Sequence, residues 1–210
     1  MEPVFQLDAQ RLVALYDTWT SLWHREPAAV SEPDQDNLQD RFKCSVMALH
    51  QANFRLWHEE DQARDPHASD SIVAAAKRTI DRVNQLRNDQ IEKCDAILLE
   101  ALAQHQLPAT GAEMHSETPG LMLDRLSILT LKIYHTREEV QRPHAPHGHA
   151  ERNRERLAIL TTQREQLAAS LNRLWQRVLE GESSFCVYRQ LKMYNDPELN
   201  PVLYGIGLTR

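Results

Sequence analysis

The stretch IDRVNQLRNDQIEKCD, residues 80–95, carries two opposite stripes at helical spacing. One stripe is polar and consists of Asp81, Asn84, Gln85, Asn88, Glu92 and Asp95. The other is apolar and consists of Ile80, Val83, Ile91, Cys94 and Leu98. This period predicts a helix that buries its apolar face. Because Asn and Asp are weak helix formers, we expect the polar stripe to hold a buried network or a ligand rather than to face water.

Helical periodicity recurs along most of the chain. Local signals mark several boundaries: Asp8 as an N-cap, Pro66 as a stop, Thr118-Pro119 as an N-cap followed by a first-turn proline, and Gly181 as a C-cap. We predict five helices, at about residues 9–24, 36–64, 69 or 70 to 105, 119–141 and 151–180.

Helices of this length, about 45 Å at 1.5 Å per residue, pack as near-antiparallel neighbours when their connectors are short. We therefore predict an all-α fold: an elongated up-down bundle of about five long helices in a single domain, residues 1–210. The His-rich segment at about 142–150 is expected to be a solvent loop. The tail, about residues 182–210, is expected to pack over one end of the bundle.

The composition restricts the partners and the compartment. With 24 Lys+Arg against 30 Asp+Glu, the chain has a net charge of −6, which argues against nucleic-acid binding. Its three cysteines form no CxxC pair, as is typical of a reducing cytoplasm. The N-terminus lacks the features of a signal peptide, and no apolar run reaches membrane-spanning length. We expect a cytoplasmic protein without membrane insertion.

The end of the second helix, LWHEEDQARD, concentrates groups that can carry chemistry. Asn53 and Glu60 occupy positions where the helical period calls for apolar residues, and Asp61 and Arg64 lie on the next row. A face that changes from apolar to polar indicates entry into a site. The alternative is a helix end whose charges are solvated or paired.

A metal ion is a second expectation. His58 is placed to share an ion with Asp61, three residues on, or with Glu92 across a helix pair. Carboxylate and amide oxygens suit Mg²⁺ or Mn²⁺ better than Zn²⁺, and HExxH is absent. A minor alternative is haem held by His50, His58 or His135.

The fourth helix, PGLMLDRLSILTLKIYH, is apolar nearly all round, which predicts burial. Arg125 and Lys132 are exceptions on a shared face, and buried cations need a partner. They either meet an anionic ligand together with Arg87, or form salt bridges with Asp81, Glu92 or Asp95.

These candidates sort into three groups. The catalytic candidates are Glu60, Asp61, Glu92 and Asp95. The metal-ligand candidates are His58, Asp61 and Glu92. The ligand-binding candidates are Arg64, Asn84, Gln85, Arg87, Asn88, Arg125, Lys132, Arg189 and Lys192.

The fifth helix carries a seam of heptad type, formed by Leu157, Leu160, Leu167, Leu171, Leu174 and Val178. Such a seam supports dimerisation. Arg164 lies on it, where a charged residue specifies register at some cost in stability. A homodimer is therefore an expectation.

Four blocks in fixed order resemble the bacterial domain-of-unknown-function family 4254 (DUF4254): LWHEEDQARD, IDRVNQLRNDQIEKCD, ETPGLMLDRLSILTLKIYH and YRQLKMYNDPELNP. The resemblance extends from about Leu56 to Pro201, without the His-rich segment. It implies an all-helical cytoplasmic bacterial protein. Because members occur near genes for glycan or lipopolysaccharide assembly, it points to nucleotide-sugar or sugar-phosphate chemistry. The family brings no established catalytic residues, so no role is carried over.

Two functions follow as hypotheses. The first is an enzyme that binds a small phosphorylated molecule, a nucleotide, nucleotide sugar or sugar phosphate, with Mg²⁺ or Mn²⁺ as the candidate cofactor. The second is a non-catalytic scaffold whose polar stripe fixes helix register. A site needs cavity volume and unpaired polar atoms, whereas a register network has neither.

Overall fold

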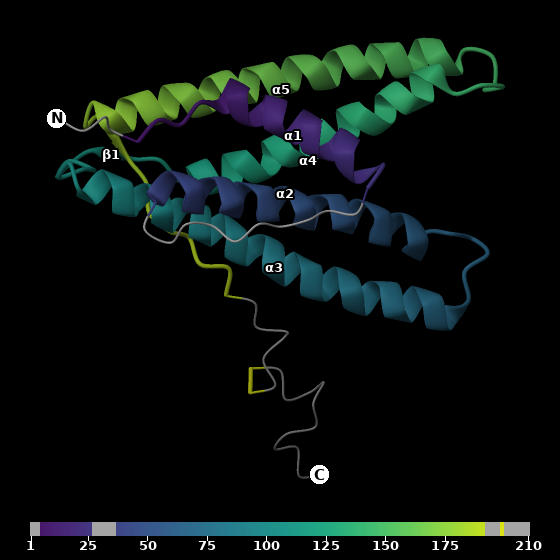
Figure 1. Cartoon of the computed structure of the whole chain (residues 1–210), viewed down its shortest axis with the longest axis horizontal. Coiled ribbons are helices and arrows are strands. Elements are labelled where there is room, and N and C mark those ends of the chain that lie inside the picture. The colour runs from purple at the N-terminus through teal and green to yellow at the C-terminus, as the bar shows by residue number, and fades with distance from the viewer. Residues whose placement is uncertain (1–4, 27–36, 192–197, 200–210) are drawn as a thin grey trace.

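The computed structural model describes residues 5–26, 37–191 and 198–199, and it confirms the all-α bundle (Figure 1). The predicted helices are present with small shifts at their ends. They are α1 (Ala9–Trp23), α2 (Leu38–Ala63), α3 (Asp70–Ala103), α4 (Pro119–Gln141) and α5 (His149–Leu179). The sequence did not predict two short strands, β1 (Glu113–Met114) and β2 (Ser183–Ser184), which pair in parallel.

Local capping explains why the helix ends were predictable. The Asp8 side chain accepts a hydrogen bond from the Arg11 backbone N–H at 3.0 Å, and Thr118 accepts one from Leu121 at 3.2 Å. Gly181, just past α5, has φ +76°, a left-handed conformation that glycine adopts without strain. Asn37 caps α2, so that helix begins slightly later than predicted.

The bundle is built from two antiparallel pairs, α2 with α3 and α4 with α5, and α1 lies along them (Figure 1). The α2–α3 and α4–α5 connections lie at the same end of the molecule, and β1 lies at the other (Figure 1). The ring of Phe5, just before α1, contacts Phe42 near the start of α2, and Trp23 at the end of α1 contacts Phe54 further along α2. The first helix therefore runs in the same direction as α2.

The core takes side chains from all five helices. The predicted apolar stripe of α3 is buried, with Ile80, Val83, Ile91, Cys94 and Leu98 each at most 5% exposed. In α5, Leu167, Leu171, Leu174 and Val178 are buried in the same core. This part of the heptad seam therefore packs within the molecule and is not free to form a dimer.

Arg164 on that seam also has an internal role. It is 9% exposed, pairs with Asp17 of α1 at 2.8 Å and reaches Thr130 of α4 at 3.3 Å. The residue therefore links α1, α4 and α5 within one chain.

The fourth helix is not buried all round, and this part of the prediction was wrong. Arg125 and Lys132 are exposed, and Arg125 forms an ion pair with Glu117. The inner face of α4 instead buries Leu123, Leu126 and two polar side chains, Asp124 and Ser127. Long apolar runs do not tell which side of such a helix meets solvent.

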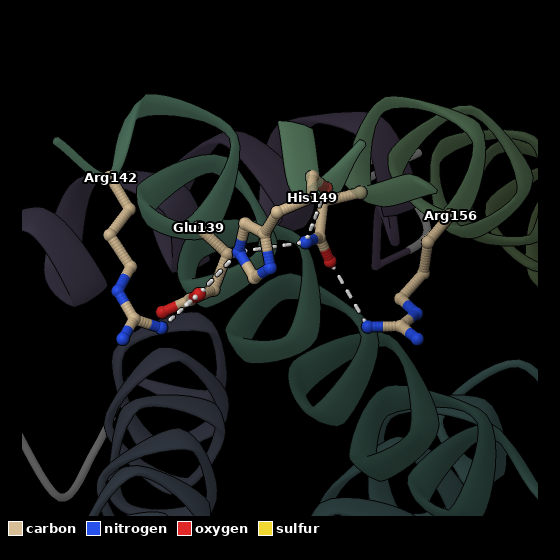
Figure 2. Close-up of polar contacts among 5 residues, drawn as sticks. Glu139, Arg142, His149 and Arg156 are labelled. Atoms are coloured by element: carbon tan, nitrogen blue, oxygen red, sulfur yellow. Dashed lines mark hydrogen bonds and ion pairs between the residues drawn. The ribbon is translucent and has the colours of Figure 1, made fainter. Parts of the chain in front are cut away.

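Polar contacts hold part of the His-rich segment where the chain passes from α4 to α5 (Figure 2). His144 and His147 are exposed, as expected of a solvent loop. His149 is instead the first residue of α5, and its Nε2 lies 2.8 Å from a carboxylate oxygen of Glu139 on α4. Arg142 binds the same oxygen at 3.1 Å, and these two hydrogen bonds lower the pKa of Glu139. The corner is therefore closed by its own polar contacts.

Within the ranges described, no helix combines the length and the apolar character that crossing a bilayer requires.

Candidate functional site

A groove of about 330 Å³ lies between α2, α3 and α4. Its lining comes from one face of each helix. The lining residues are Asn53, Leu56, Trp57, Glu60, Asp61, Arg64, Asn84, Arg87, Ile128 and Leu131. Along each helix these positions, or adjacent pairs of them on α2, recur every three to four residues, so a single stripe of each helix faces the groove. We call this feature the α2–α4 groove.

The floor of the α2–α4 groove is a buried hydrogen-bond network. Asn53 donates to Asp124 at 2.8 Å and to Ser127 at 3.0 Å. The hydroxyl of Ser127 lies 2.8 Å from His50 Nδ1, and His50 Nε2 lies 2.8 Å from the Thr20 hydroxyl. All five side chains are at most 7% exposed. The network therefore joins α1, α2 and α4 beneath the groove.

Burial controls the charges in this network. It lowers the pKa of His50 to about 3, so the ring is neutral at physiological pH. Both ring nitrogens of His50 are already hydrogen-bonded, which leaves none for a haem iron. Burial also raises the pKa of Asp124, while the nearby Arg87 guanidinium opposes that rise.

Arg87 is the cation between the network and the open groove. Its Nε lies 3.7 Å from Asp124 Oδ1, too far for a hydrogen bond. This Nε is buried and has no hydrogen-bond partner in the described residues. A buried donor without a partner is costly, so Arg87 is the groove residue with unused binding capacity.

The structure brings five of the predicted site residues together. Glu60, Asp61 and Arg64 come from α2, and Asn84 and Arg87 come from α3. Glu60 accepts from Arg64 at 2.7 Å across one helical turn, and both side chains remain substantially exposed. The acidic and basic groups at the rim are therefore accessible to a ligand.

The rest of the polar stripe on α3 does not reach this groove. Gln85 donates to the exposed Asp89 at 2.8 Å, Asn88 is buried outside the lining, and Glu92 accepts from the Gln190 backbone N–H at 2.7 Å. The expectation of one continuous site stripe was therefore wrong. A stripe turns slowly around a long helix, so its residues meet different neighbours along the length.

Asp95 has a structural role instead of the predicted catalytic one. It is 1% exposed, and it accepts from the Thr118 hydroxyl at 2.5 Å and from the Gly120 backbone N–H at 2.7 Å. Both donors belong to the start of α4, where unpaired N–H groups favour a carboxylate. Burial raises the pKa of Asp95 to about 6 despite these hydrogen bonds.

The remaining cations lie elsewhere. Arg125 and Lys132 share a face as predicted, but they line a different hollow of about 660 Å³ that Gln163 and Gln166 of α5 also line. Arg189 is exposed and does not line the groove. Lys192 lies outside the described residues. Arg125, Lys132 and Arg189 therefore do not join Arg87 in the lining of the α2–α4 groove.

The predicted metal ligands are not assembled. Across residues 5–26, 37–191 and 198–199, one group of three or more histidine, cysteine or acidic side chains is close enough to share an ion, and it contains neither Asp61 nor Glu92. It joins His58 to His24 and His135. His58 was identified from the sequence, but no local spacing relates His24, at the end of α1, to the other two.

Comparison with known families gives one match. The family model described as "Protein of unknown function (DUF4254)" matches residues 43–187. The match begins before Leu56 and includes the His-rich segment, but it stops short of the block at 188–201. All residues of the α2–α4 groove lie within it. No curated protein and no solved structure matches the chain.

Proposed function

The chain belongs to the DUF4254 family, and we propose that it binds a small phosphorylated molecule in the α2–α4 groove and acts on it as an enzyme. One observation carries this proposal: the groove combines open volume with a buried guanidinium nitrogen, Arg87 Nε, that has no hydrogen-bond partner in the described part of the chain. A network that serves register alone would leave neither.

The basic side of the groove suits a phosphate. Arg87 on α3 and Arg64 on α2 provide two guanidinium groups, and the Asn84 amide adds neutral donors. Guanidinium groups bind phosphate oxygens in pairs, with short charge-assisted hydrogen bonds. Arg64 is 69% exposed and bound only to the neighbouring Glu60 among the ion pairs described, so a ligand can recruit it at little cost.

The acidic side suits a hard metal ion or a general base. Glu60 and Asp61 are adjacent on α2 and both line the groove. Carboxylate oxygens beside substrate phosphates are the usual ligands of Mg²⁺. The volume of about 330 Å³ lies at the lower end of the range for ligand sites. We therefore favour a sugar phosphate or a mononucleotide over a larger nucleotide sugar.

The scaffold alternative has support of its own. The network from Thr20 through His50 and Ser127 to Asn53 is paired at each hydroxyl and ring nitrogen. Such a network fixes how α1, α2 and α4 pack. It lies under the groove, whereas the proposed ligand contacts come from the rim.

A thermal-shift panel tests the proposal. The purified protein is heated with sugar phosphates, nucleotides and nucleotide sugars, each with and without Mg²⁺ or Mn²⁺, because a ligand of the folded state raises the melting temperature. For the ligand found, we expect Asn84→Ala and Arg87→Gln to weaken binding about tenfold or more. The matched control is Arg125→Gln, which replaces an exposed arginine of α4 that does not line the groove. This variant should bind the ligand as wild type does.

Two results would count against the proposal of an enzyme with its site in this groove. If no ligand class raises the melting temperature, the scaffold alternative is favoured. If a ligand binds Asn84→Ala and Arg87→Gln as well as it binds wild type, the site lies elsewhere. Asn84→Ala is informative because it leaves the pair of Arg87 and Asp124 intact.

A further inference from the structure

Three histidines from three different helices converge towards the end of the bundle where the α2–α3 and α4–α5 connections lie. His24 directly follows α1, His58 belongs to α2 and His135 to α4. One ring nitrogen of each lies within 4.8 Å of the corresponding nitrogen of the other two. The rings stand at 70–83° to one another, with centroids 5.1–5.9 Å apart. They therefore meet edge to face and do not stack.

Hydrogen bonds fix the tautomers of two of these rings. His24 Nδ1 lies 2.7 Å from the Thr20 backbone carbonyl, and a carbonyl can only accept. His135 Nδ1 lies 2.8 Å from the Glu138 carboxylate, which also accepts when ionised. In the neutral form of each ring the proton is therefore on Nδ1, and Nε2 carries a lone pair. Carbonyl and carboxylate partners of this kind orient metal-binding histidines in proteins.

Neither of these two nitrogens accepts a hydrogen bond from a described residue. His24 Nε2 and His135 Nε2 are both buried and without a hydrogen-bond partner there. Leaving one buried polar atom unsatisfied is unfavourable, and two in the same cluster ask for an explanation. A metal ion between them would satisfy both at once.

Aromatic side chains hold the three rings in place. Tyr134 stacks on His24 with centroids 4.3 Å apart, and Trp57 stacks on His135 at 4.6 Å. Phe54 lies edge to face with His58 at 4.6 Å. The cluster is therefore pre-organised, and each ring has little freedom to turn its nitrogen away.

We propose that His24, His58 and His135 form a binding site for a divalent transition-metal ion, with Zn²⁺ the best match. Neutral imidazole nitrogens suit zinc and its neighbours and do not suit Mg²⁺ or Ca²⁺. Zn–N distances of about 2.0–2.1 Å place tetrahedral ligands about 3.3 Å apart, so the nitrogens draw together on binding. The three histidines do not line the α2–α4 groove, and the site does not rest on the proposed function.

Within the described ranges, the three histidines leave the fourth position of such an ion to an external ligand. Over the described residues no further histidine, cysteine or acidic side chain joins the group. His58 lines a hollow of about 680 Å³ that extends along α2 and α3. An ion bound by three histidines and water in this place has the ligand set of a catalytic zinc site, not that of a closed structural one.

Metal titration of the full, untagged chain tests the site. Metal-free protein is titrated with Zn²⁺ in a calorimeter and with Co²⁺ in a spectrophotometer, which detects nitrogen ligands by visible absorption. We expect one ion per chain with a Kd below about 1 µM. His58→Gln and His135→Gln should each weaken zinc binding about 100-fold and abolish the cobalt spectrum.

The control variants use histidines outside the cluster. His67→Gln replaces an exposed histidine of the α2–α3 connection, and the double variant H144Q/H147Q removes the exposed histidines before α5. Both should bind zinc as wild type does. The proposed site would be overturned if wild type did not bind zinc or if His58→Gln bound it as tightly as wild type does. It would also be overturned if, among the variants, only H144Q/H147Q lost zinc binding. Because His58 is exposed, His58→Gln should stay folded, which the helical circular-dichroism signal will verify.

Discussion

At the scale of single residues, two buried carboxylates show how similar groups take different roles. Asp95 accepts hydrogen bonds from Thr118 and Gly120, so it holds the start of α4 against α3. Asp124 accepts from Asn53 and faces the Arg87 guanidinium at the floor of the groove. The first carboxylate stabilises the packing of two helices, and the second sets the charge next to a cavity.

Asp95 should make stability depend on pH. Burial raises its folded-state pKa to about 6 from the ordinary value of 3.8. The folded state therefore binds the proton more tightly than the unfolded state, so this stabilisation is complete below pH 4 and disappears as pH rises through 6. The difference in free energy of unfolding between wild type and Asp95→Asn should grow in favour of wild type, by up to about 3 kcal/mol, from pH 7 to pH 4. Urea unfolding across this range measures it, and a constant difference would contradict the assignment.

At the scale of helices and strands, the sequence predicted what local chemistry determines. The caps at Asp8, Thr118 and Gly181 lie beside the helices they delimit, so boundaries could be read from neighbouring residues. The two-residue strands have no period to detect, and their pairing joins positions 113 and 183, far apart in the chain.

The candidate site was harder to predict, because a residue belongs to it only if its helix turns that residue towards the groove. The cluster LWHEEDQARD does reach the α2–α4 groove, and two of the α3 candidates meet it there. Arg125 and Lys132 lie on a neighbouring face of α4 and line a different hollow. His24 enters its cluster only through the packing of α1 on α2 and α4, which no spacing in the sequence reveals.

The contact between α3 and α4 gives a prediction at this scale. A Cβ at position 120 would lie 2.5 Å from the Ile91 carbonyl oxygen and 2.9 Å from the Asp95 carboxylate. Alanine ordinarily favours a helix over glycine by about 1 kcal/mol. At this position the collision with backbone should prevail, and Gly120→Ala should destabilise the protein by about 2 kcal/mol in denaturant unfolding. If Gly120→Ala stabilised the protein instead, α3 and α4 would not be in close contact at this position.

At the scale of the whole molecule, the two ends of the bundle differ. At one end β1 and β2 pair, and Phe185 inserts into the common core. Towards the other lie the three-histidine cluster and the hairpin connections of both helix pairs (Figure 1). The tail was expected to pack over one end of the bundle. In its described part, Gln190 contacts Glu92 on α3, and none of residues 182–191 lines the α2–α4 groove. Residues 182–191 of the tail therefore leave the groove uncovered, and Phe185 anchors this segment in the core at the opposite end.

This separation predicts that the tail affects stability without affecting the binding sites. Phe185 is 2% exposed, and Phe185→Ala should cost about 3 kcal/mol of unfolding free energy because it leaves a cavity among core residues. Leu191 is 83% exposed, and Leu191→Ala in the same segment should change stability by less than about 0.5 kcal/mol. At a temperature where Phe185→Ala is still folded, its affinity for zinc and for the groove ligand should equal that of wild type. A loss of either affinity in the folded variant would show that the tail is coupled to the sites, because neither site touches Phe185.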